Sequence, residues 1–371
     1  MKRLRILLPL VLVFVFVFTA CTPETVVETV EVVQTVEVVK EVEVVKEVEV
    51  VKEVEVEAEA GVSGQVVLYT SESEDKVNEM VADFNEVYPD IEIFIYRTGT
   101  GEVTAKLQAE MEGGDIKADM MWFADLDFFR KLADEDMLLS YMPVGGDLVD
   151  EGNHYFDNRA HEVRYIFNIL AYNTGLVTEP PTGWKDLLNP DYKGRIGMAS
   201  ALYSGGAFNN LGTLVNEDDF GWDFYETLNE NEVVVGRGNG GIGTNIATGE
   251  FVMGQLIDFM ARNHKNEGSP VEMVWPEEGA VLIPTPIGIY NGTTNPEACQ
   301  AFIDYLYSDR AQALFVAQNY VSINPDAPKP EGYTEAEGGI KILVPPVEFM
   351  AENREELRTK YEDLFGPPPD A

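Results

Sequence analysis

Strand-like and helix-like segments alternate in the first part of the chain, and this alternation constrains the fold more than any other feature. Apolar runs at 65–69, 91–96 and 118–123 have the length and composition of buried strands. The stretch after the first run carries an apolar stripe at helical spacing, made of Val77, Met80, Val81, Phe84 and Val87. Because strand–helix–strand units form parallel sheets with right-handed crossovers, we predict an α/β fold.

Two longer apolar runs, at 164–173 and 281–290, flank a middle unit. If each is a strand, the chain crosses twice between two lobes, which is a hinge arrangement suited to closing on a ligand. The expected boundaries are 63–165 for the first part of lobe 1, 166–284 for lobe 2, and 285–371 for the return strand of lobe 1, its helices and a docking helix at 348–365.

The N-terminus has the features of an export signal. Three basic residues precede a 15-residue apolar run that ends at Ala20, which is short for a membrane span. The run ends in Phe-Thr-Ala-Cys at 18–21, which resembles a bacterial lipobox, although Phe18 stands where Leu is usual. We therefore expect a signal peptide over 1–20, a lipid on Cys21 and an extracytoplasmic location, in the periplasm or on the outer face of the cell membrane. An ordinary signal peptide and an uncleaved anchor are the alternatives.

A low-complexity segment over residues 21–62 follows the cysteine. It repeats a six-residue Val-Glu-Val-Val-Lys-Glu unit, and residues 22–60 contain 12 Glu and 3 Lys. A period of six matches neither the 3.5-residue nor the 3.6-residue helical repeat, which argues against a coiled coil. We interpret the segment as an extended, self-repelling stalk, with a self-associating β stalk as the alternative.

Charge and cysteine content exclude several classes of function. The 371 residues include 65 acidic and 26 basic side chains, for a formal net charge of −39. Nucleic acids and anionic membranes require a basic surface, so we expect neither as a partner, and membrane attachment would come only through the lipid. The two cysteines cannot build a disulfide framework or a cysteine-rich zinc site.

Enzyme and cofactor motifs are weak. Gly236–Gly241 matches G-x-G-x-x-G, but a dinucleotide site needs this motif to open a full βαβ unit, and the export signal argues against a bound nicotinamide. We interpret the motif as a glycine turn before a helix from Thr248. There is no Walker A sequence, and Ser204 is not in a Gly-x-Ser-x-Gly elbow. We expect no cofactor and no catalysis, with an exported hydrolase or sensor ectodomain as the alternative class.

Small polar residues follow the predicted strands. In open α/β sheets, ligands bind beyond the carboxyl ends of the strands, where helix N-termini present free N–H groups to anions. We expect hydroxyl and glycine residues there to hold an anion, and Asp258 or the ring of Trp122 to hold an amine. Helix capping, core packing and surface exposure are the alternative roles. The candidate residues are Thr70, Ser71, Thr98, Gly99, Thr100, Trp122, Phe123, Asp125, Ser204, Gly205, Gly206, Asn209, Gln255 and Asp258.

A set of short motifs stands in order over residues 64–330. The motifs are Tyr69-Thr70-Ser71, Arg97–Glu102, Ala118–Trp122, Leu170–Thr174, Trp184–Leu187, Tyr192–Ile196, Ser204-Gly205-Gly206, Gly268–Val271, Pro276–Gly279 and Asn295–Ala298. Together they resemble the extracellular solute-binding proteins of ABC importers, in the group that takes iron(III), thiamine, phosphoglycerate and 2-aminoethylphosphonate-like ligands. The resemblance implies a two-lobed type II periplasmic-binding-protein fold, capture of a small solute in the cleft as a monomer, and delivery to the permease subunits.

The same resemblance bears on the ligand. Iron-binding members of the group use a His in the first loop and a Tyr pair in the second lobe. The matching positions here are Ser71-Glu72-Ser73 and 254–259, which contain neither. This favours an anionic or zwitterionic solute of the phosphonate or phosphate-ester type, with iron(III), a ferric chelate or thiamine as the alternatives.

Overall fold

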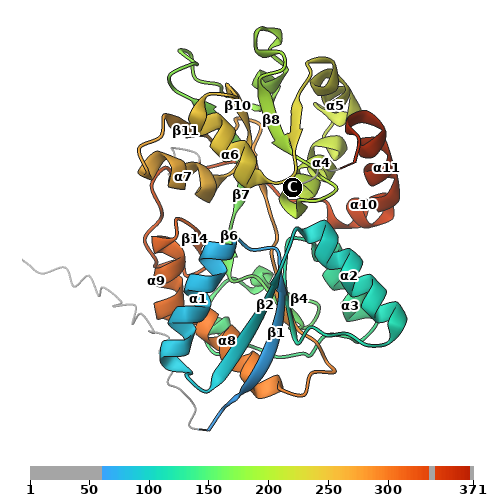
Figure 1. Cartoon of the computed structure of the whole chain (residues 1–371), viewed down its shortest axis with the longest axis vertical. Helices are drawn as coiled ribbons and strands as arrows, with labels where there is room; N and C mark the ends of the chain where they lie inside the picture. Colours follow the sequence, from blue (N-terminus) through green and yellow to red (C-terminus); the bar gives the residue numbers. More distant parts are fainter. Residues whose placement is uncertain (1–60, 334–338, 368–371) are drawn as a thin grey trace, which may run out of the picture. The chain divides into compact units, whose positions relative to one another are not determined.

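A computed structural model describes residues 61–333 and 339–367 (Figure 1). The predicted signal peptide, Cys21 and nearly all of the predicted stalk lie outside these residues. Within the described ranges, every helix is too short or too polar to span a bilayer.

A six-stranded sheet, in the order β2-β1-β3-β13-β5-β4, forms the first lobe. Strand β1 pairs in parallel with both β2 and β3, as the strand–helix alternation predicts. Its Val66 and Leu68 are fully buried, and the predicted stripe of α1 packs in the same hydrophobic cluster. The strands are β1 (Gly64–Thr70), β2 (Ile91–Arg97), β3 (Met120–Trp122), β4 (His154–Tyr155), β5 (Ala160–His161) and β13 (Ile287–Ile289). The helices are α1 (Glu74–Val87), α2 (Thr100–Gly113), α3 (Leu126–Asp134), α8 (Pro296–Tyr307) and α9 (Asp309–Ala317), with short 3-10 turns at Gly146–Leu148 and Glu151–Asn153.

A seven-stranded sheet forms the second lobe, in the order β15-β12-β7-β10-β8-β9 with β11 also paired to β7. Strand β7 is buried along its whole length, which explains its unbroken apolar sequence. The strands are β7 (Phe167–Asn173), β8 (Ile196–Ala199), β9 (Val234–Gly236), β10 (Met253–Ile257), β11 (Val271–Val274), β12 (Ala280–Leu282) and β15 (Ile342–Leu343). The helices are α4 (Gly205–Asn216), α5 (Gly221–Glu230), α6 (Asn239–Thr248) and α7 (Asp258–Asn266), with 3-10 turns at Trp184–Leu188 and Pro190–Tyr192.

Three stretches of chain cross between the described elements of the two lobes. Two of them, called here the connecting segments, lie between β5 and β7 and between β12 and β13, and the third follows α9 and leads to β15. The single long strands predicted for 164–173 and 281–290 are each divided in the structure. The first becomes β6 (Arg164–Tyr165) and β7, and β6 pairs with β14 (Val321–Ser322) outside both large sheets. The second becomes β12 and β13, because Pro284 and Pro286 lack the N–H groups that a continuous ladder needs.

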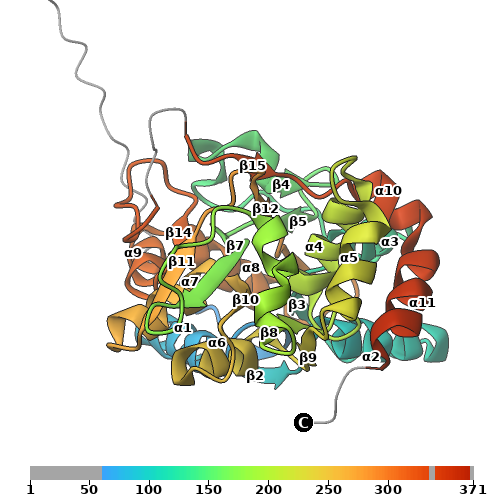
Figure 2. The same cartoon turned by 90° about the horizontal axis from the view of Figure 1, so that it is seen from above.

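The C-terminal segment packs on the second lobe. Strand β15 pairs with β12, and Met350, Leu357 and Tyr361 are buried in the hydrophobic cluster of the second lobe. The sequence predicts one docking helix over 348–365, without assigning it to a lobe. Instead there are two, α10 (Val347–Glu352) and α11 (Arg354–Phe365), which lie beside α4 and α5 (Figure 2). The break falls at Asn353, whose side chain donates a hydrogen bond back to the carbonyl of Phe349.

Candidate ligand-binding site

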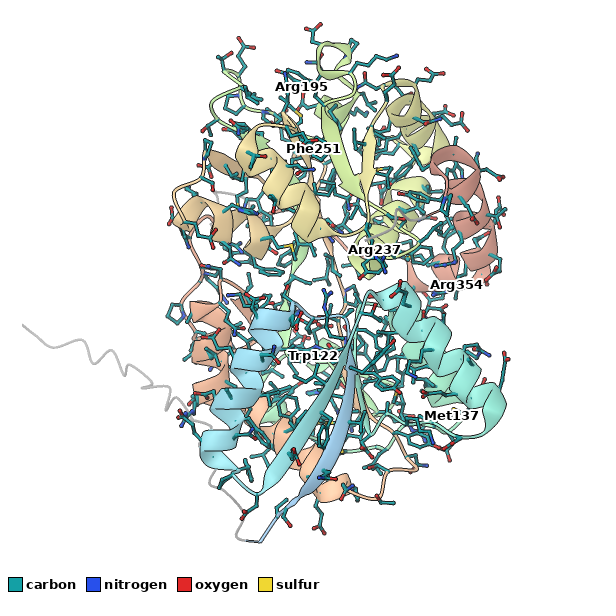
Figure 3. The ribbon with its side chains drawn as sticks, viewed as in Figure 1. Trp122, Met137, Arg195, Arg237, Phe251 and Arg354 are labelled. Carbon is teal, nitrogen blue, oxygen red and sulfur yellow. The ribbon has the colours of Figure 1, made fainter. Side chains whose placement is uncertain are left out.

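Residues from both lobes and from both connecting segments enclose a cavity of about 410 Å³. The first lobe contributes the loops after β1 and β2, and the second contributes the segments before α4 and α6. The connecting segments add Arg164, Ile166, Ile283 and Thr285. Figure 3 shows Arg237 at the edge of the second lobe that faces the first.

Four helix N-termini meet at this cavity. The N-caps of α1, α2, α4 and α6 are Ser73, Gly99, Ser204 and Gly238, and all four line the cavity. Ser204 accepts hydrogen bonds from the Ala207 N–H and from the Asn239 side chain, which joins the starts of α4 and α6. Helix N-termini carry partial positive charge and unpaired N–H groups, so this arrangement attracts anions.

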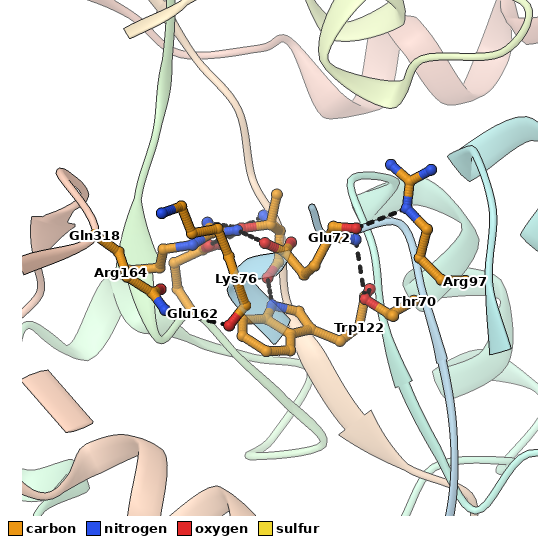
Figure 4. Close-up of polar contacts among 9 residues, drawn as sticks. Thr70, Glu72, Lys76, Arg97, Trp122, Glu162, Arg164 and Gln318 are labelled. Atoms are coloured by element: carbon orange, nitrogen blue, oxygen red, sulfur yellow. Dashed lines mark hydrogen bonds and ion pairs between the residues drawn. The ribbon is translucent and has the colours of Figure 1, made fainter. Parts of the chain in front are cut away.

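Three arginines add positive charge to the lining. Arg97 donates from Nε to the Glu72 carbonyl at 2.8 Å, and Figure 4 shows its terminal nitrogens pointing away from Glu72. Arg237 lies over the Tyr203 ring at 4.5 Å and pairs with Glu102 of α2 at 2.5 Å, which links the two lobes.

Arg164 is buried and forms an ion pair with Glu72 (Figure 4). It also donates to Thr285 Oγ1 at 2.7 Å and lies 4.5 Å from the centre of the Tyr320 ring. Burial is the largest single effect and lowers the pKa of Arg164, but Glu72, Tyr320 and Glu162 together outweigh it and the net pKa is raised. Glu72 is the one carboxylate among the described residues that line the cavity, and this pair neutralises it.

Glu162 links the two connecting segments through hydrogen bonds to Thr285. Its carboxylate accepts hydrogen bonds from the Thr285 N–H at 3.0 Å and from the Thr285 hydroxyl at 2.8 Å. The Trp122 indole donates to the Thr285 carbonyl at 3.1 Å (Figure 4). Burial raises the pKa of Glu162 to about 7, against the lowering effects of Thr285 and Arg164.

Six of the predicted site residues line the cavity. They lie in the loop after β1, at the start of α2 and at the start of α4. They are Ser71, Gly99, Thr100, Ser204, Gly205 and Gly206. Gly99 and Gly205 also allow close contact between the lobes. A Cβ on Gly99 would lie 2.4 Å from the Tyr203 ring, and one on Gly205 would lie 2.2 Å from the Ala124 carbonyl oxygen.

The other predicted neutral residues lie outside the cavity lining and have partners elsewhere. Thr70 donates to the Trp122 carbonyl, Thr98 to Glu102, Asn209 to the Gly205 carbonyl and Gln255 to Asn168. Trp122 and Phe123 are almost fully buried in hydrophobic clusters, and the cation over the Trp122 ring is Arg164 of the same chain. The Trp122 ring is therefore already in contact with a cation of the same chain, in the position where we had predicted a ligand amine.

Neither predicted acidic residue lines the cavity. Asp125 caps α3 and pairs with Arg354 of α11 at 2.5 Å. Asp258 is fully buried, pairs with Arg262 at 2.6 Å and accepts the Phe167 N–H at 2.9 Å. Asp258 was expected to hold an amine, but its charge is already balanced within the second lobe.

Sequence reasoning missed Arg97, Arg164, Arg237 and Tyr203, all of which line the cavity. Arg97 ends β2, so the rule that selected Thr98 also covers it. The helix predicted to start at Thr248 in fact begins at Asn239 and ends at Thr248, which brings the glycine turn directly to the cavity. Among the described residues, no cluster of three His, Cys, Asp or Glu side chains is arranged to hold a metal ion.

Comparisons with known proteins agree with this geometry. The sequence profile of the family described as "Bacterial extracellular solute-binding protein" matches residues 79–339. The spermidine/putrescine-binding periplasmic protein 1 of Haemophilus influenzae is 26% identical over 62% of this chain and 67% of its own length. A putative 2-aminoethylphosphonate-binding periplasmic protein of Salmonella paratyphi A is 25% identical over 58% of this chain and 65% of its own length.

The fold is also found in solved structures. The periplasmic binding protein AfuA from Actinobacillus pleuropneumoniae, solved with exogenous fructose-6-phosphate bound, superposes with a TM-score of 0.73. The match covers 81% of this chain and 98% of AfuA at 22% identity, so it supports the predicted type II fold. Taken with the profile match and the cavity between the lobes, it establishes that this chain belongs to the bacterial extracellular solute-binding protein family.

Proposed function

We propose that this protein captures a small anionic solute of the phosphonate or phosphate-ester type in the 410 Å³ cavity and delivers it to the permease of an ABC importer. The observation that carries the proposal is the meeting of four helix N-termini with Arg97 and Arg237 around one cavity. The N–H groups there that have no partner within the protein, and the guanidinium groups, can donate to an anion.

The balance of charge favours an anion over a polyamine. A polycation needs carboxylates that are free to pair with it, because a buried ammonium without a partner is costly. Glu72 is neutralised by Arg164 and Glu102 by Arg237, so among the arginines that line the cavity the charge of Arg97 is left in excess. The spermidine-binding relative therefore does not determine the ligand class proposed here.

Closure of the lobes would complete the site. Arg97 and Thr100 belong to the first lobe, whereas Ser204, Arg237 and Asn239 belong to the second. An anion that contacts both groups binds the closed form more tightly and shifts the population toward it. We further propose export by residues 1–20, attachment through a lipid on Cys21, and a monomeric binding unit. Mass spectrometry of the N-terminal peptide purified from membranes tests the lipid directly.

Calorimetry on the purified protein tests which class of ligand binds. Inorganic phosphate, a phosphonate and a phosphate ester are titrated beside spermidine, thiamine and ferric citrate. We expect binding of at least one phosphorus oxyanion and recovery of that ligand unchanged. Binding of spermidine alone would overturn the proposal, and a chemically altered ligand would point to an enzyme.

Matched variants locate the site. Arg97→Gln and Arg237→Gln should each weaken anion binding about 10-fold to 100-fold, as expected for loss of a charge-assisted hydrogen bond. Arg195→Gln removes the same charge from the second lobe away from the cavity lining and should leave affinity unchanged (Figure 3). Equal affinities in all three variants would show that the anion binds elsewhere.

A further inference from the structure

One wall of the cavity is apolar. It consists of Ile166, Ile257, Phe259, Met260 and Ile283. Four of these side chains are at most 8% exposed and belong to the hydrophobic cluster of the first lobe and the connecting segments, while Met260 is half-buried against the same cluster. The wall is thus the side of a packed hydrophobic core that faces the cavity, and it presents hydrocarbon to a bound ligand.

This apolar wall borders the helix N-termini of the cavity at Gly206. A Cβ on Gly206 would lie 3.1 Å from Ile283 Cδ1 and 3.6 Å from Ile257 Cδ1. Gly206 is also in the first turn of α4, next to Gly205 and the N-cap Ser204. An anionic group held at the start of α4 therefore has its organic substituent directed against hydrocarbon within a few ångströms.

Polar groups beside the apolar wall are already engaged. Thr285 donates its hydroxyl to Glu162 and accepts from Arg164. The Ile166 carbonyl accepts the Ile283 N–H at 3.0 Å. Asp258, next to Ile257 in sequence, is fully buried and paired with Arg262. Asn239 at the start of α6 has a buried side-chain oxygen without a partner, but among the described residues that line the cavity no carboxylate is unpaired. An ammonium group placed against this wall would therefore lose water without gaining an opposite charge, whereas a methyl group would gain apolar contact.

We propose that the solute is an anion whose organic part is apolar and carries no amine, which distinguishes it from an aminoalkylphosphonate and from a sugar phosphate. This inference rests on the proposed function, because it takes the anionic group to lie at the helix N-termini. The specificity residues it names are Ile257, Ile283 and Met260.

A pair of ligands of equal size tests the inference. n-Propylphosphonate and 2-aminoethylphosphonate differ in one terminal group, methyl or ammonium. Both are titrated by calorimetry at a pH at which the phosphonate groups are fully ionised and the amine is charged, with methylphosphonate as a third ligand. We expect n-propylphosphonate to bind at least 10-fold more tightly than 2-aminoethylphosphonate and more tightly than methylphosphonate, because only its chain reaches the wall.

The outcomes separate the two proposals. Equal or tighter binding of 2-aminoethylphosphonate overturns the apolar-ligand inference and leaves the anion-binding function standing. Equal binding of n-propylphosphonate and methylphosphonate also overturns the inference, because the wall would then add nothing. If neither these phosphonates nor inorganic phosphate binds, the anion-binding function itself fails.

Two variants of Met260 test the wall directly. Met260→Glu places a carboxylate among the hydrocarbon groups and should reverse the preference toward 2-aminoethylphosphonate. Met260→Gln has nearly the same shape without the charge and should weaken n-propylphosphonate binding without favouring the amine. Thermal unfolding of both variants checks that they are folded. An unchanged preference in folded Met260→Glu would exclude this wall from the binding site.

Discussion

Arg354 and Asp125 join the two lobes outside the cavity. The guanidinium of Arg354 on α11 donates to both carboxylate oxygens of Asp125, at 2.5 and 3.1 Å, and Asp125 at the same time caps α3. Asp127 lies 3.5 Å from the same guanidinium. The pair is separated by 229 positions in sequence, so the C-terminal helices act as a contact between lobes in addition to the two connecting segments.

Arg354→Met should shift the protein toward its open form. Loss of the two-point pair removes an attraction between the lobes, and we expect solute affinity to fall about 3-fold to 10-fold, which corresponds to roughly 1 kcal/mol. Calorimetry measures the affinity, and small-angle scattering without ligand should show a larger radius. Lys360→Met is the matched control, because Lys360 on the same helix pairs with Glu226 within the second lobe. A radius unchanged from wild type would remove Arg354 from any role in closure.

Gly205→Ala should impair closure more strongly. The added Cβ would lie 2.2 Å from the Ala124 carbonyl and 2.7 Å from Thr100 Oγ1, and both atoms belong to the first lobe. Because the contact is with backbone, the lobes must separate to relieve it, and we expect affinity to fall more than about 10-fold. Gly113→Ala, where nothing lies within 4 Å of the new methyl group, should bind normally. Normal solute binding by the folded Gly205→Ala protein would contradict the closeness of the lobes described here.

Arg164→Met should destabilise the protein. Removal of one partner of a buried ion pair leaves the other charge uncompensated, at a cost of about 3–5 kcal/mol. Urea unfolding of Arg164→Met, Glu72→Met and the double variant measures the coupling between them. We expect the double variant to be more stable than the sum of the single effects predicts. Simple additivity would mean that Arg164 and Glu72 do not depend on each other.

Glu162 and His161 should give the stability opposite dependences on pH. Burial raises the Glu162 pKa from 4.5 to about 7, so its contribution is full below about pH 4.5 and is lost as the pH rises through 7. Burial, with a smaller effect of His154, lowers the His161 pKa from 6.5 to about 3, so its contribution is full above 6.5 and is lost as the pH falls.

Glu162→Gln isolates the alkaline part of this behaviour. The amide keeps an acceptor for Thr285 but does not titrate, so wild type should lose up to about 3 kcal/mol relative to the variant between pH 5 and pH 8. Thermal unfolding at both pH values measures the difference. Parallel melting profiles for the two proteins would show that Glu162 does not change its charge in this range.

The local elements were largely predictable, and their partners were not. Alternation and apolar spacing predicted β1 to β3 and α1 because each signal lies within a few residues. The run at 281–290 looked like one strand because periodicity does not reveal which sheet a residue joins. Asp125 and Asp258 looked available for a ligand, yet Arg354 and Arg262 neutralise them, and the sequence gives no sign of the first of these pairings. Arg237 was missed for a related reason, since its importance depends on where α6 begins.

Arg164 and Thr285 come from the segments about which the lobes would turn, and both line the cavity. Residues nearest an axis of rotation move least, so these two would present the same atoms to a solute before and after closure. This stationary base would contribute equally to binding in both states, and the more distant helix starts would supply the contacts that differ between the two states. The stationary base would thereby set the affinity of the open form, and the helix starts would set how strongly a bound solute favours the closed form.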